Sequence, residues 1–455
     1  MSAPTVVTLV HLGCARNLID SELILARLAE QGLLVSGSLE DADVAVLNTC
    51  SFIGPAREES EQRLSELLAR KDAGELSHVV VAGCLVQRFQ RELERRFPAV
   101  DLFAEISDYA ALGRAVADMT RGGAVPRYLA AGGLREAERE GARLLATPGS
   151  YAYLRISHGC DHTCSFCAIP SIRGPHRSKP LDALRSEARE LIDAGVRELV
   201  LVAEDATAWG RDAGQELPAL VEALAELDGE HWIRIMYAYP NRFPWGLAPL
   251  LREHPRVVPY LDIPVQHAAT PVLRAMRRAG SGDQVRAILD RLRDEVPGIT
   301  LRTTLLVGFP GETERDVDEL ERFVREYRLG RMGVFGYSPE EGTAGFDLDG
   351  ELPADEIEAR RERILAARDA ALDEAQRELV GTEQEVLIDE AGDEVAVARG
   401  VQDAPEVDLV TLVQGCEAPV GARVAVRVEG LDEEGNAVAV PVAAGTPLRS
   451  PGGAR

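Results

Sequence analysis

Short apolar runs alternate with stretches of helical periodicity along the first 120 residues. The apolar runs are rich in valine and have the length of strands; they cover residues 6–10, 44–47 and 79–82. The stretches that place apolar residues at helical spacing are 18–31, 56–71 and 87–96. Because alternating strands and helices form parallel sheets covered by helices, residues 1–120 are predicted to be a parallel-sheet α/β domain.

A second alternating series begins at Tyr151, after a Gly-, Ala- and Arg-rich stretch, 121–149, that reads as a linker. Its candidate strands are 152–156, 198–202, 232–237, 258–263, 299–307 and 332–337. The segments between them have the length of helices. Six such units predict an open or partial (β/α) barrel.

The pattern changes twice more before the end of the chain. Residues 355–379 predict one long charged helix, so the barrel domain with this helix is expected to span 150–380. Short valine-rich runs separated by Gly and acidic turns follow over 381–443 and predict a small β-barrel. The Pro- and Gly-rich stretch 444–455 is expected to be a flexible tail. The fold class is therefore α/β with a small β-barrel at the end.

The acidic character of the chain bears on its partners. Its formal charge is −25, from 75 acidic and 50 basic residues. Such a protein repels nucleic-acid phosphate unless it carries a local basic patch, so a basic protein is the easier partner. No apolar run is long enough to span a bilayer, and the first residues resemble a strand rather than a targeting segment. A cytoplasmic protein is expected.

Three of the seven cysteines lie on one short loop after the first predicted barrel strand. Cys160, Cys164 and Cys167 have the spacing C-x3-C-x2-C. Three local thiolates can hold an iron–sulfur cluster and leave one iron open for a substrate. The alternative is a structural zinc site in a protein without turnover, with His158, His162 or His176 as the fourth ligand. Zinc sites more often use two C-x2-C pairs, and this chain has none, so the spacing favours the cluster.

The other cysteines are dispersed. Cys14, Cys50 and Cys84 each follow a predicted strand of the first domain, and the carboxyl ends of parallel strands meet at one edge of the sheet. We therefore expect a second three-cysteine cluster there, against the alternative of three buried core cysteines. Cys416 lies in the predicted β-barrel, outside both sets, and is expected to be structural.

The cysteine loop, with Phe166 before its third cysteine, resembles the signature of the radical S-adenosylmethionine (SAM) superfamily. The words LGCARN (12–17), NTCSFI (48–53) and GCLVQR (83–88) are similar to the N-terminal domain of the methylthiotransferases. This resemblance implies two [4Fe-4S] clusters with three cysteines each, and SAM as cofactor. In that family one SAM, bound at the barrel cluster, yields a radical, and the N-terminal cluster presents sulfur that a second SAM has methylated.

Two substrate classes exist in the family, tRNA adenosines and an aspartate of the small-subunit ribosomal protein numbered twelve. Four sequence motifs resemble those of the ribosomal-protein type; they lie at 167–174, 261–267, 307–313 and 337–343. The predicted β-barrel resembles a TRAM module, which binds RNA in tRNA-modifying relatives. Residues 381–443 hold 14 acidic and 3 basic residues, a balance of −11, which favours a basic protein over RNA. Modification of tRNA remains the alternative, and acidity that only keeps the protein soluble is the simplest other explanation.

Contacts to SAM are expected from motif analogy alone. The candidate residues, each near a strand end or on the cysteine loop, are Phe166, Glu204, Arg302, Gly308 and Glu312. His267 is as compatible with a structural role as with a catalytic one, and the sequence indicates no catalytic residue beyond the cluster ligands. An electron donor and a sulfur donor are implied as further partners, without their identity. The sequence also leaves open the oligomeric state and the order of methylation and insertion.

Overall fold

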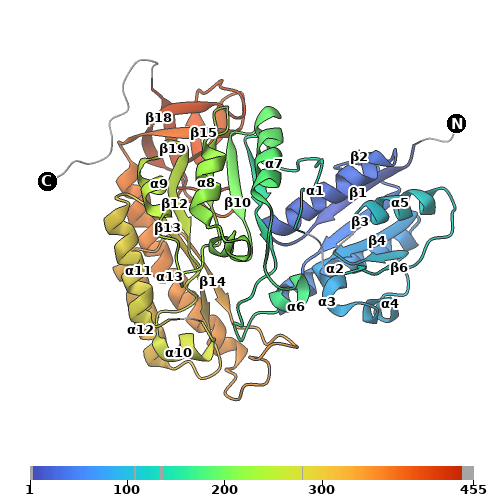
Figure 1. Ribbon diagram of the computed structural model, residues 1–455, viewed down its shortest axis with the longest axis horizontal. Coiled ribbons are helices and arrows are strands. Elements are labelled where there is room, and N and C mark those ends of the chain that lie inside the picture. The colour runs from blue at the N-terminus through green and yellow to red at the C-terminus, as the bar shows by residue number, and fades with distance from the viewer. Residues whose placement is uncertain (1–3, 107–108, 134–136, 279, 443–455) are drawn as a thin grey trace.

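The computed structural model describes residues 4–106, 109–133, 137–278 and 280–442. These residues form two α/β units side by side, with a small β-barrel against the second (Figure 1). The first unit is a six-stranded sheet in the order β2-β1-β3-β4-β5-β6, and its strands pair in parallel. Its strands are β1 (Val6–His11), β2 (Leu34–Ser36), β3 (Val44–Thr49), β4 (His78–Gly83), β5 (Leu102–Ala104) and β6 (Tyr128–Leu129).

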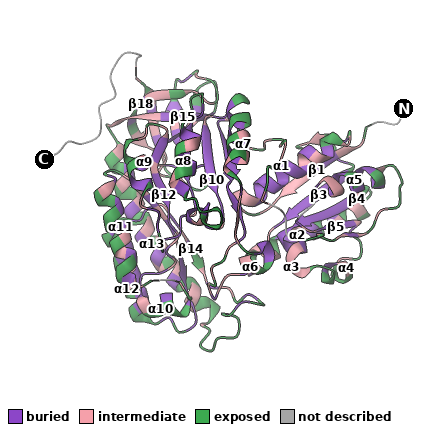
Figure 2. Ribbon diagram, viewed as in Figure 1, coloured by how far each residue is buried: buried purple, intermediate pink, exposed green. Residues whose placement is uncertain are grey.

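Helices cover both faces of this sheet. Its helices are α1 (Ala15–Glu30), α2 (Gly54–Asp72), α3 (Cys84–Phe89), α4 (Glu92–Arg96) and α5 (Tyr109–Thr120). Buried side chains of α1 and α5 share one core, whereas those of α2, α3 and α4 share the other. Every residue of β3 is buried, as expected for a central strand covered on both sides (Figure 2).

The first domain differs from the sequence-based expectation in several parts, since β2, β5 and α5 were not predicted. The predicted helix 87–96 is broken into α3 and α4 because Gln90 adopts φ +48°, which no α-helix tolerates. The predicted linker contributes β6, whose Tyr128 pairs with Phe103, so the first sheet extends to Leu129. A two-residue strand carries too little periodicity to be seen in a sequence.

The second unit is an open, curled parallel sheet in the order β14-β13-β12-β11-β10-β7, which confirms the predicted partial barrel. The strands are β7 (Tyr151–Arg155), β10 (Glu198–Val202), β11 (Trp232–Ile235), β12 (Val257–Asp262), β13 (Thr300–Val307) and β14 (Met332–Gly336). The α-helices of this part are α6 (Ile169–Arg173), α7 (Leu181–Asp193), α8 (Leu217–Ala225), α9 (Leu247–Glu253), α10 (Thr270–Ala275), α11 (Gly282–Glu295) and α12 (Glu314–Glu326). A small hairpin of β8 (Ser157–His158) and β9 (Arg177–Ser178) closes the base of the cysteine loop, and two 3₁₀ turns, Ala206–Ala208 and Arg211–Ala213, follow β10.

The predicted long helix is α13 (Ala354–Leu379), which packs against α12 and β14. It leads into a closed five-stranded barrel in the order β15-β16-β17-β19-β18, as the valine pattern predicts. The strands are β15 (Glu383–Glu390), β16 (Val395–Gly400), β17 (Thr411–Gln414), β18 (Arg423–Leu431) and β19 (Ala437–Pro441). The predicted tail 444–455 lies outside the described residues.

The small barrel is joined to the open barrel by buried ion pairs. Glu198 of β10 forms ion pairs with Arg399 of β16 at 2.7 Å and with Arg234 of β11 at 2.5 Å. The segment 401–410 between β16 and β17 then reaches the inner face of the open sheet, where the Tyr260 hydroxyl donates to Asp408 at 2.6 Å. Within the described part of the chain, none of the helices has the length and apolar character that crossing a membrane requires.

Candidate functional site

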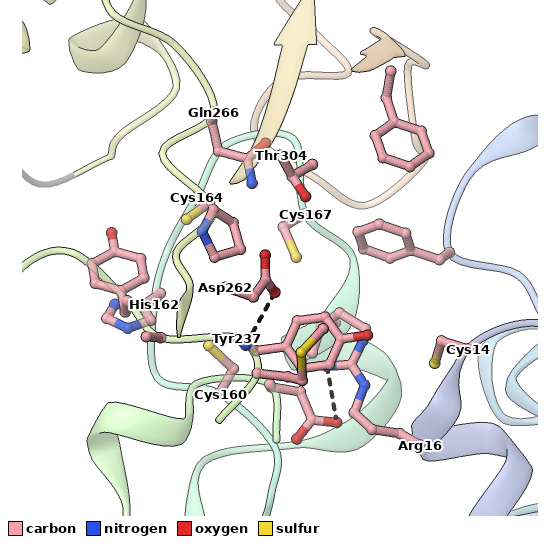
Figure 3. A pocket seen from close by; sticks show the side chains of 18 of the residues that line it. Cys14, Arg16, Cys160, His162, Cys164, Cys167, Tyr237, Asp262, Gln266 and Thr304 are labelled. Atoms are coloured by element: carbon pink, nitrogen blue, oxygen red, sulfur yellow. Dashed lines mark hydrogen bonds and ion pairs between the residues drawn. The ribbon is translucent and has the colours of Figure 1, made fainter. Parts of the chain in front are cut away.

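A cavity of about 350 Å³ lies where the three parts of the chain meet. Its lining comes from the cysteine loop, from strand ends of the open sheet, from α1 and its neighbourhood, and from Val407 of the small barrel (Figure 3). The carboxyl ends of the strands contribute Glu204, Tyr237 and Asp262, and the middle of β13 contributes Thr304. The cavity therefore occupies the position at which ligands bind in parallel α/β folds.

The structure brings all three cysteines of the loop to this cavity. Cys160, Cys164 and Cys167 line it and come from one side (Figure 3). The loop is held by backbone hydrogen bonds, from Cys160 N to the Gly174 carbonyl at 3.1 Å and from Ser165 N to the Met276 carbonyl at 2.9 Å. Three thiols thus face the cavity from a loop that is anchored on both sides.

The dispersed cysteines meet at the edge of the first sheet. Cys14 follows β1, Cys50 follows β3 and Cys84 begins α3 directly after β4. The chain order reverses between β1 and β3, and ligands of open α/β sheets bind at such a switch point. A Cβ added at Gly13 would lie 3.2 Å from the Cys50 sulfur, so the first two loops are in contact. Cys14 also lines the cavity, opposite the cysteine loop (Figure 3).

Burial and charge set the thiol pKa values. Burial raises the pKa of Cys50 and of Cys160 to about 12 and that of Cys167 to about 11. Burial also raises the pKa of Cys84, although Arg173 opposes the shift. For Cys14 burial is outweighed, mainly by the nearby Arg16 guanidinium, and the pKa is lowered. Metal ligation requires thiolates, so iron binding at these sites releases protons.

The histidines considered as zinc ligands have other partners. His162 Nε2 lies 2.7 Å from Asp205 Oδ2, and the ring stacks on Tyr239 with 3.7 Å between centroids. His176 Nε2 lies 3.1 Å from Ser178 Oγ, and His158 Nε2 lies 3.6 Å from Glu140. Among the described residues no three His, Cys, Asp or Glu side chains are grouped to hold a single metal ion. Thiols that bind a cluster each take a separate iron and need not meet at one atom.

The residues expected to contact SAM separate into two groups. Phe166, Glu204 and Arg302 line the cavity. Gly308 and Glu312 are not among the residues that line it. Glu312 is buried and accepts from Gly308 N at 3.0 Å, while Arg360 of α13 lies 2.8 Å away. A side chain at Gly308 would overlap Ile357, so this turn packs tightly against α13.

His267 belongs to the same buried group as Glu312. Its Nε2 lies 3.4 Å from Glu312 Oε2, and its Nδ1 accepts from Ala269 N at 2.9 Å. For Glu312 the cost of burial is outweighed by His267 and Arg360, which lower its pKa. This arrangement is a structural anchor between β13, its following turn and α13.

Several cavity residues were not predicted from the sequence. They are Arg16, Tyr237, Asp262, Gln266, Arg278 and Thr304. Asp262 and Gln266 lie within the motif at 261–267, and Tyr237 lies just after the end of β11, so strand position was an available signal for them. Thr304 lies in the middle of β13 and had no such signal. Asp262 accepts from Tyr237 N at 3.1 Å, and its other oxygen has no hydrogen-bond partner among the described residues. Burial raises the pKa of Asp262 despite the nearby Arg302.

Three family descriptions match successive parts of the chain. The first is "Uncharacterized protein family UPF0004" over residues 6–105, the second "Radical SAM superfamily" over 154–324, and the third "TRAM domain" over 380–435. The solved structure of the radical SAM methyltransferase TsrM from Kitasatospora setae superposes with a TM-score of 0.54 over 76% of this chain and 77% of that chain. Its sequence identity is 14%, so this likeness concerns the fold.

Curated relatives match over almost the full length. The ribosomal protein uS12 methylthiotransferase RimO of Trichlorobacter lovleyi is 40% identical over 93% of this chain and 95% of its own. The protein of the same name from an Anaeromyxobacter species (strain Fw109-5) is 40% identical over 99% of this chain and 97% of its own. That from Myxococcus xanthus is 39% identical over 94% and 90%. The chain therefore belongs to the RimO family of radical SAM methylthiotransferases.

Proposed function

We propose that this enzyme inserts a methylthio group at the β-carbon of an aspartate of ribosomal protein uS12. The observation that carries the proposal is the shared cavity: Cys14 of the first cysteine set and all three cysteines of the second line it. Radical formation and sulfur delivery must reach the same carbon atom, so both cysteine sets need access to one substrate pocket. The names of the full-length relatives support uS12 as the substrate.

The cofactors of this radical SAM enzyme are SAM and [4Fe-4S] clusters. We propose that Cys160, Cys164 and Cys167 hold one cluster and that Cys14, Cys50 and Cys84 hold the other. The residues fit anionic clusters because each set has an arginine beside a sulfur. Arg278 Nη1 lies 3.7 Å from Cys164 Sγ, and Arg173 Nη2 donates to Cys84 Sγ at 3.4 Å. When bound, the barrel cluster and SAM supply a deoxyadenosyl radical that removes hydrogen from the substrate.

We propose that the remaining cavity residues bind and orient SAM and the substrate and keep water out of the cavity. Phe166, Glu204 and Arg302 are the proposed SAM contacts that line the cavity, whereas Gly308 and Glu312 belong to the buried group that packs against α13. The mouth carries three exposed apolar side chains, one from each part of the chain: Phe52 at 38%, Phe335 at 47% and Val407 at 47% exposure. Apolar rims of this kind pack against protein side chains.

The small barrel supports a basic protein as the substrate. Asp389, Asp403 and Asp408 pair internally with arginine or tyrosine side chains. The solvent-facing acidic residues within 381–443 are Glu390, Asp393, Glu394, Glu406, Glu417, Glu429, Glu433 and Glu434. This excess of exposed acid attracts a Lys- and Arg-rich ribosomal protein and repels RNA phosphate. We therefore propose that the enzyme does not bind nucleic acid directly. We also propose that it acts in the cytoplasm, where its ribosomal substrate is made.

The proposed reaction replaces a C–H bond by a C–S bond. The hydrogen leaves with the deoxyadenosyl part of one SAM, which also releases methionine. The methyl group comes from a second SAM, which leaves as S-adenosylhomocysteine. A one-electron reductant and a sulfur source are therefore required as further partners.

The test is a product analysis without oxygen. The reconstituted enzyme receives SAM, dithionite and sulfide with either purified uS12 or bulk tRNA, and both are read by mass spectrometry. A methylthio increment on an aspartate of uS12, with unmodified tRNA, is the expected result. An increment on tRNA alone would contradict the proposed substrate and favour an adenosine methylthiotransferase.

A further inference from the structure

Three arginines line the cavity, and two of them are committed to neighbours. Arg302 Nε and Nη1 each lie 3.6 Å from a carboxylate, those of Asp408 and Asp262 respectively. Arg278 donates to the Pro264 carbonyl, lies beside Cys164 and stacks over the Tyr239 ring at 4.2 Å. Two carboxylates lie beside Arg302, and Arg278 contacts the cysteine loop through Cys164.

The third arginine, Arg16, differs in origin and in surroundings. It follows Cys14 by two residues, and its guanidinium donates to the Ala203 carbonyl of the open barrel at 3.1 Å. The guanidinium lies over the Tyr237 ring, 4.9 Å from its centroid. Its nearest carboxylate, Glu204, is 3.8 Å away, beyond hydrogen-bond distance. Arg16 lies beside the Cys14 sulfur and near Glu204, and within the described residues no carboxylate accepts a hydrogen bond from it.

The position of Arg16 is equally specific. Its side chain extends from beside Cys14 toward Tyr237, into the space that separates Cys14 from Cys160 (Figure 3). The side chain is 16% exposed, so a partner bound there is largely removed from water. One cation thus lies between the two cysteine sets, where the reacting carbon must be.

The chemistry of the substrate determines which group lies next to the Arg16 guanidinium. The β-carbon of an aspartate carries its carboxylate directly, so a β-carbon held between the two cysteine sets brings a negative charge into the cavity. A carboxylate that leaves water needs a charged hydrogen-bonding partner, and a guanidinium matches its two oxygens. We propose that Arg16 binds the carboxylate of the target aspartate and thereby selects aspartate over asparagine. This inference rests on the proposed function and names the specificity residue within it.

The experiment measures binding as well as turnover. Anaerobic, fully reconstituted enzyme with SAM and without reductant is titrated with fluorescent uS12 and with uS12 whose target aspartate is changed to asparagine. The wild type is expected to bind the aspartate form roughly 30-fold more tightly, the size of one charge-assisted hydrogen-bonded pair. Arg16→Gln is expected to bind both forms alike. Arg177→Gln serves as the control, because Arg177 is not among the residues that line the cavity and donates to backbone carbonyls, and this variant is expected to retain the preference for aspartate.

Iron and sulfide content, read with the visible spectrum, separates recognition from cluster assembly. If Arg16→Gln retains its clusters and also the wild-type preference, the inference is overturned. If that variant loses its clusters, Arg16→Lys decides: lysine lacks the two-pronged geometry, so the preference must fall several-fold, and an unchanged preference overturns the inference. A wild type that modifies uS12 but binds both forms equally overturns the inference alone. A wild type that never modifies uS12 contradicts the proposed function instead.

Discussion

Gly159 adopts φ +72° immediately before the first cysteine of the loop. A Cβ at this position would overlap the carbonyl oxygens of Pro175 and Gly174, which are backbone atoms and cannot rotate away. The glycine therefore allows the two ends of the cysteine loop to approach each other. This close approach holds Cys160 at the cavity.

We expect Gly159→Ala to destabilise the fold and to lower the iron content of the barrel site. The matched control is Gly195→Ala, at φ +103° with no atom within 4 Å of the added methyl group. The control carries only the cost of left-handed backbone, about 1 kcal/mol. Thermal unfolding and iron analysis measure both effects. Equal losses of thermal stability and of iron in the two variants would show that the crowding at Gly159 has no effect of its own.

Arg173 connects the open barrel to the first cysteine set. It donates to Cys84 Sγ at 3.4 Å and forms a buried ion pair with Asp20 at 2.8 Å, while Arg155 also pairs with Asp20 at 2.8 Å. We expect Arg173→Met to lose iron selectively from the N-terminal site, because a cation beside the sulfur is removed. SAM cleavage by the barrel site is expected to persist while the methylthio product disappears.

Iron content and deoxyadenosine release measure this separation of the two sites. Arg177→Met is the control, since Arg177 donates only to the backbone carbonyls of Pro175 and Arg173. A variant at Arg173 that keeps full iron and full product formation would count against the role of this arginine.

The cysteines could be found from the sequence because their chemistry is specific to the residue type. The spacing on the loop and the position of Cys14, Cys50 and Cys84 after strands were enough to place them. Arg16, Tyr237 and Asp262 could not be found in this way. Arginine, tyrosine and aspartate occur throughout the chain, and these residues meet only after two sheets have packed together.

Among the helices and strands, the segment 401–410 links the small barrel to the cavity. Asp408 accepts from Tyr260 at 2.6 Å and from Ala404 N at 2.9 Å, and it lies 3.6 Å from Arg302. The segment therefore positions an arginine of the proposed SAM pocket from a different domain. Asp403, on the same segment, pairs with Arg331 at 2.7 Å.

We expect Asp408→Asn to weaken SAM binding, because Arg302 loses one of its two carboxylates and can reorient. Loss of a hydrogen bond to a charged group also costs about 1.5–3 kcal/mol of stability. Asp403→Asn should lose similar stability but keep the affinity for SAM. Calorimetric titration with SAM and thermal unfolding test the pair. The same loss of SAM affinity in both variants would mean that the segment acts only by stabilising the fold.

The longer strands of both sheets were predictable, because their apolar runs, such as those of β3, β4 and β10, are buried on both faces and are bounded by turns. The short elements were not. β2 and β5 have three residues each and β6 has two, and no Gly or Pro marks the break at Gln90. The path of 401–410 into the open barrel left no periodic signal, since its contacts are polar and irregular.

For the molecule as a whole, the junction around Glu198 ties the small barrel to the open barrel. Burial disfavours the charged form of Glu198, but Arg234 and Arg399 outweigh it and lower its pKa. Because the folded-state pKa is depressed, this stabilisation is present in full above the unfolded-state pKa near 4.5. It is lost as the pH falls through the lower, folded-state value.

We expect Glu198→Gln to lower the free energy of unfolding at pH 7 by roughly 3–5 kcal/mol, because two arginines remain buried without their partner. The difference from the wild type should shrink as the pH falls below 4.5, because the unfolded wild type then binds a proton, and it should vanish once the pH is below the lower, folded-state pKa of Glu198. Denaturant unfolding at several pH values measures it. Glu358→Gln, at an exposed pair with Arg361, should be neutral throughout. A pH-independent difference would rule out the ionised junction as its cause.

Because both cysteine sets face one cavity, we expect the barrel set to serve hydrogen removal and the N-terminal set to serve sulfur delivery at the same carbon atom. Deuterium transfer distinguishes these two steps. Purified uS12 with deuterium at the β-carbon of its aspartates is incubated without oxygen with SAM, dithionite and sulfide. The enzymes compared are the wild type and a variant with Cys14, Cys50 and Cys84 changed to alanine. We predict deuterium in the released deoxyadenosine for both enzymes, and a methylthio group on uS12 for the wild type only. Deoxyadenosine without deuterium from the wild type, while uS12 is modified, would contradict hydrogen removal at the β-carbon.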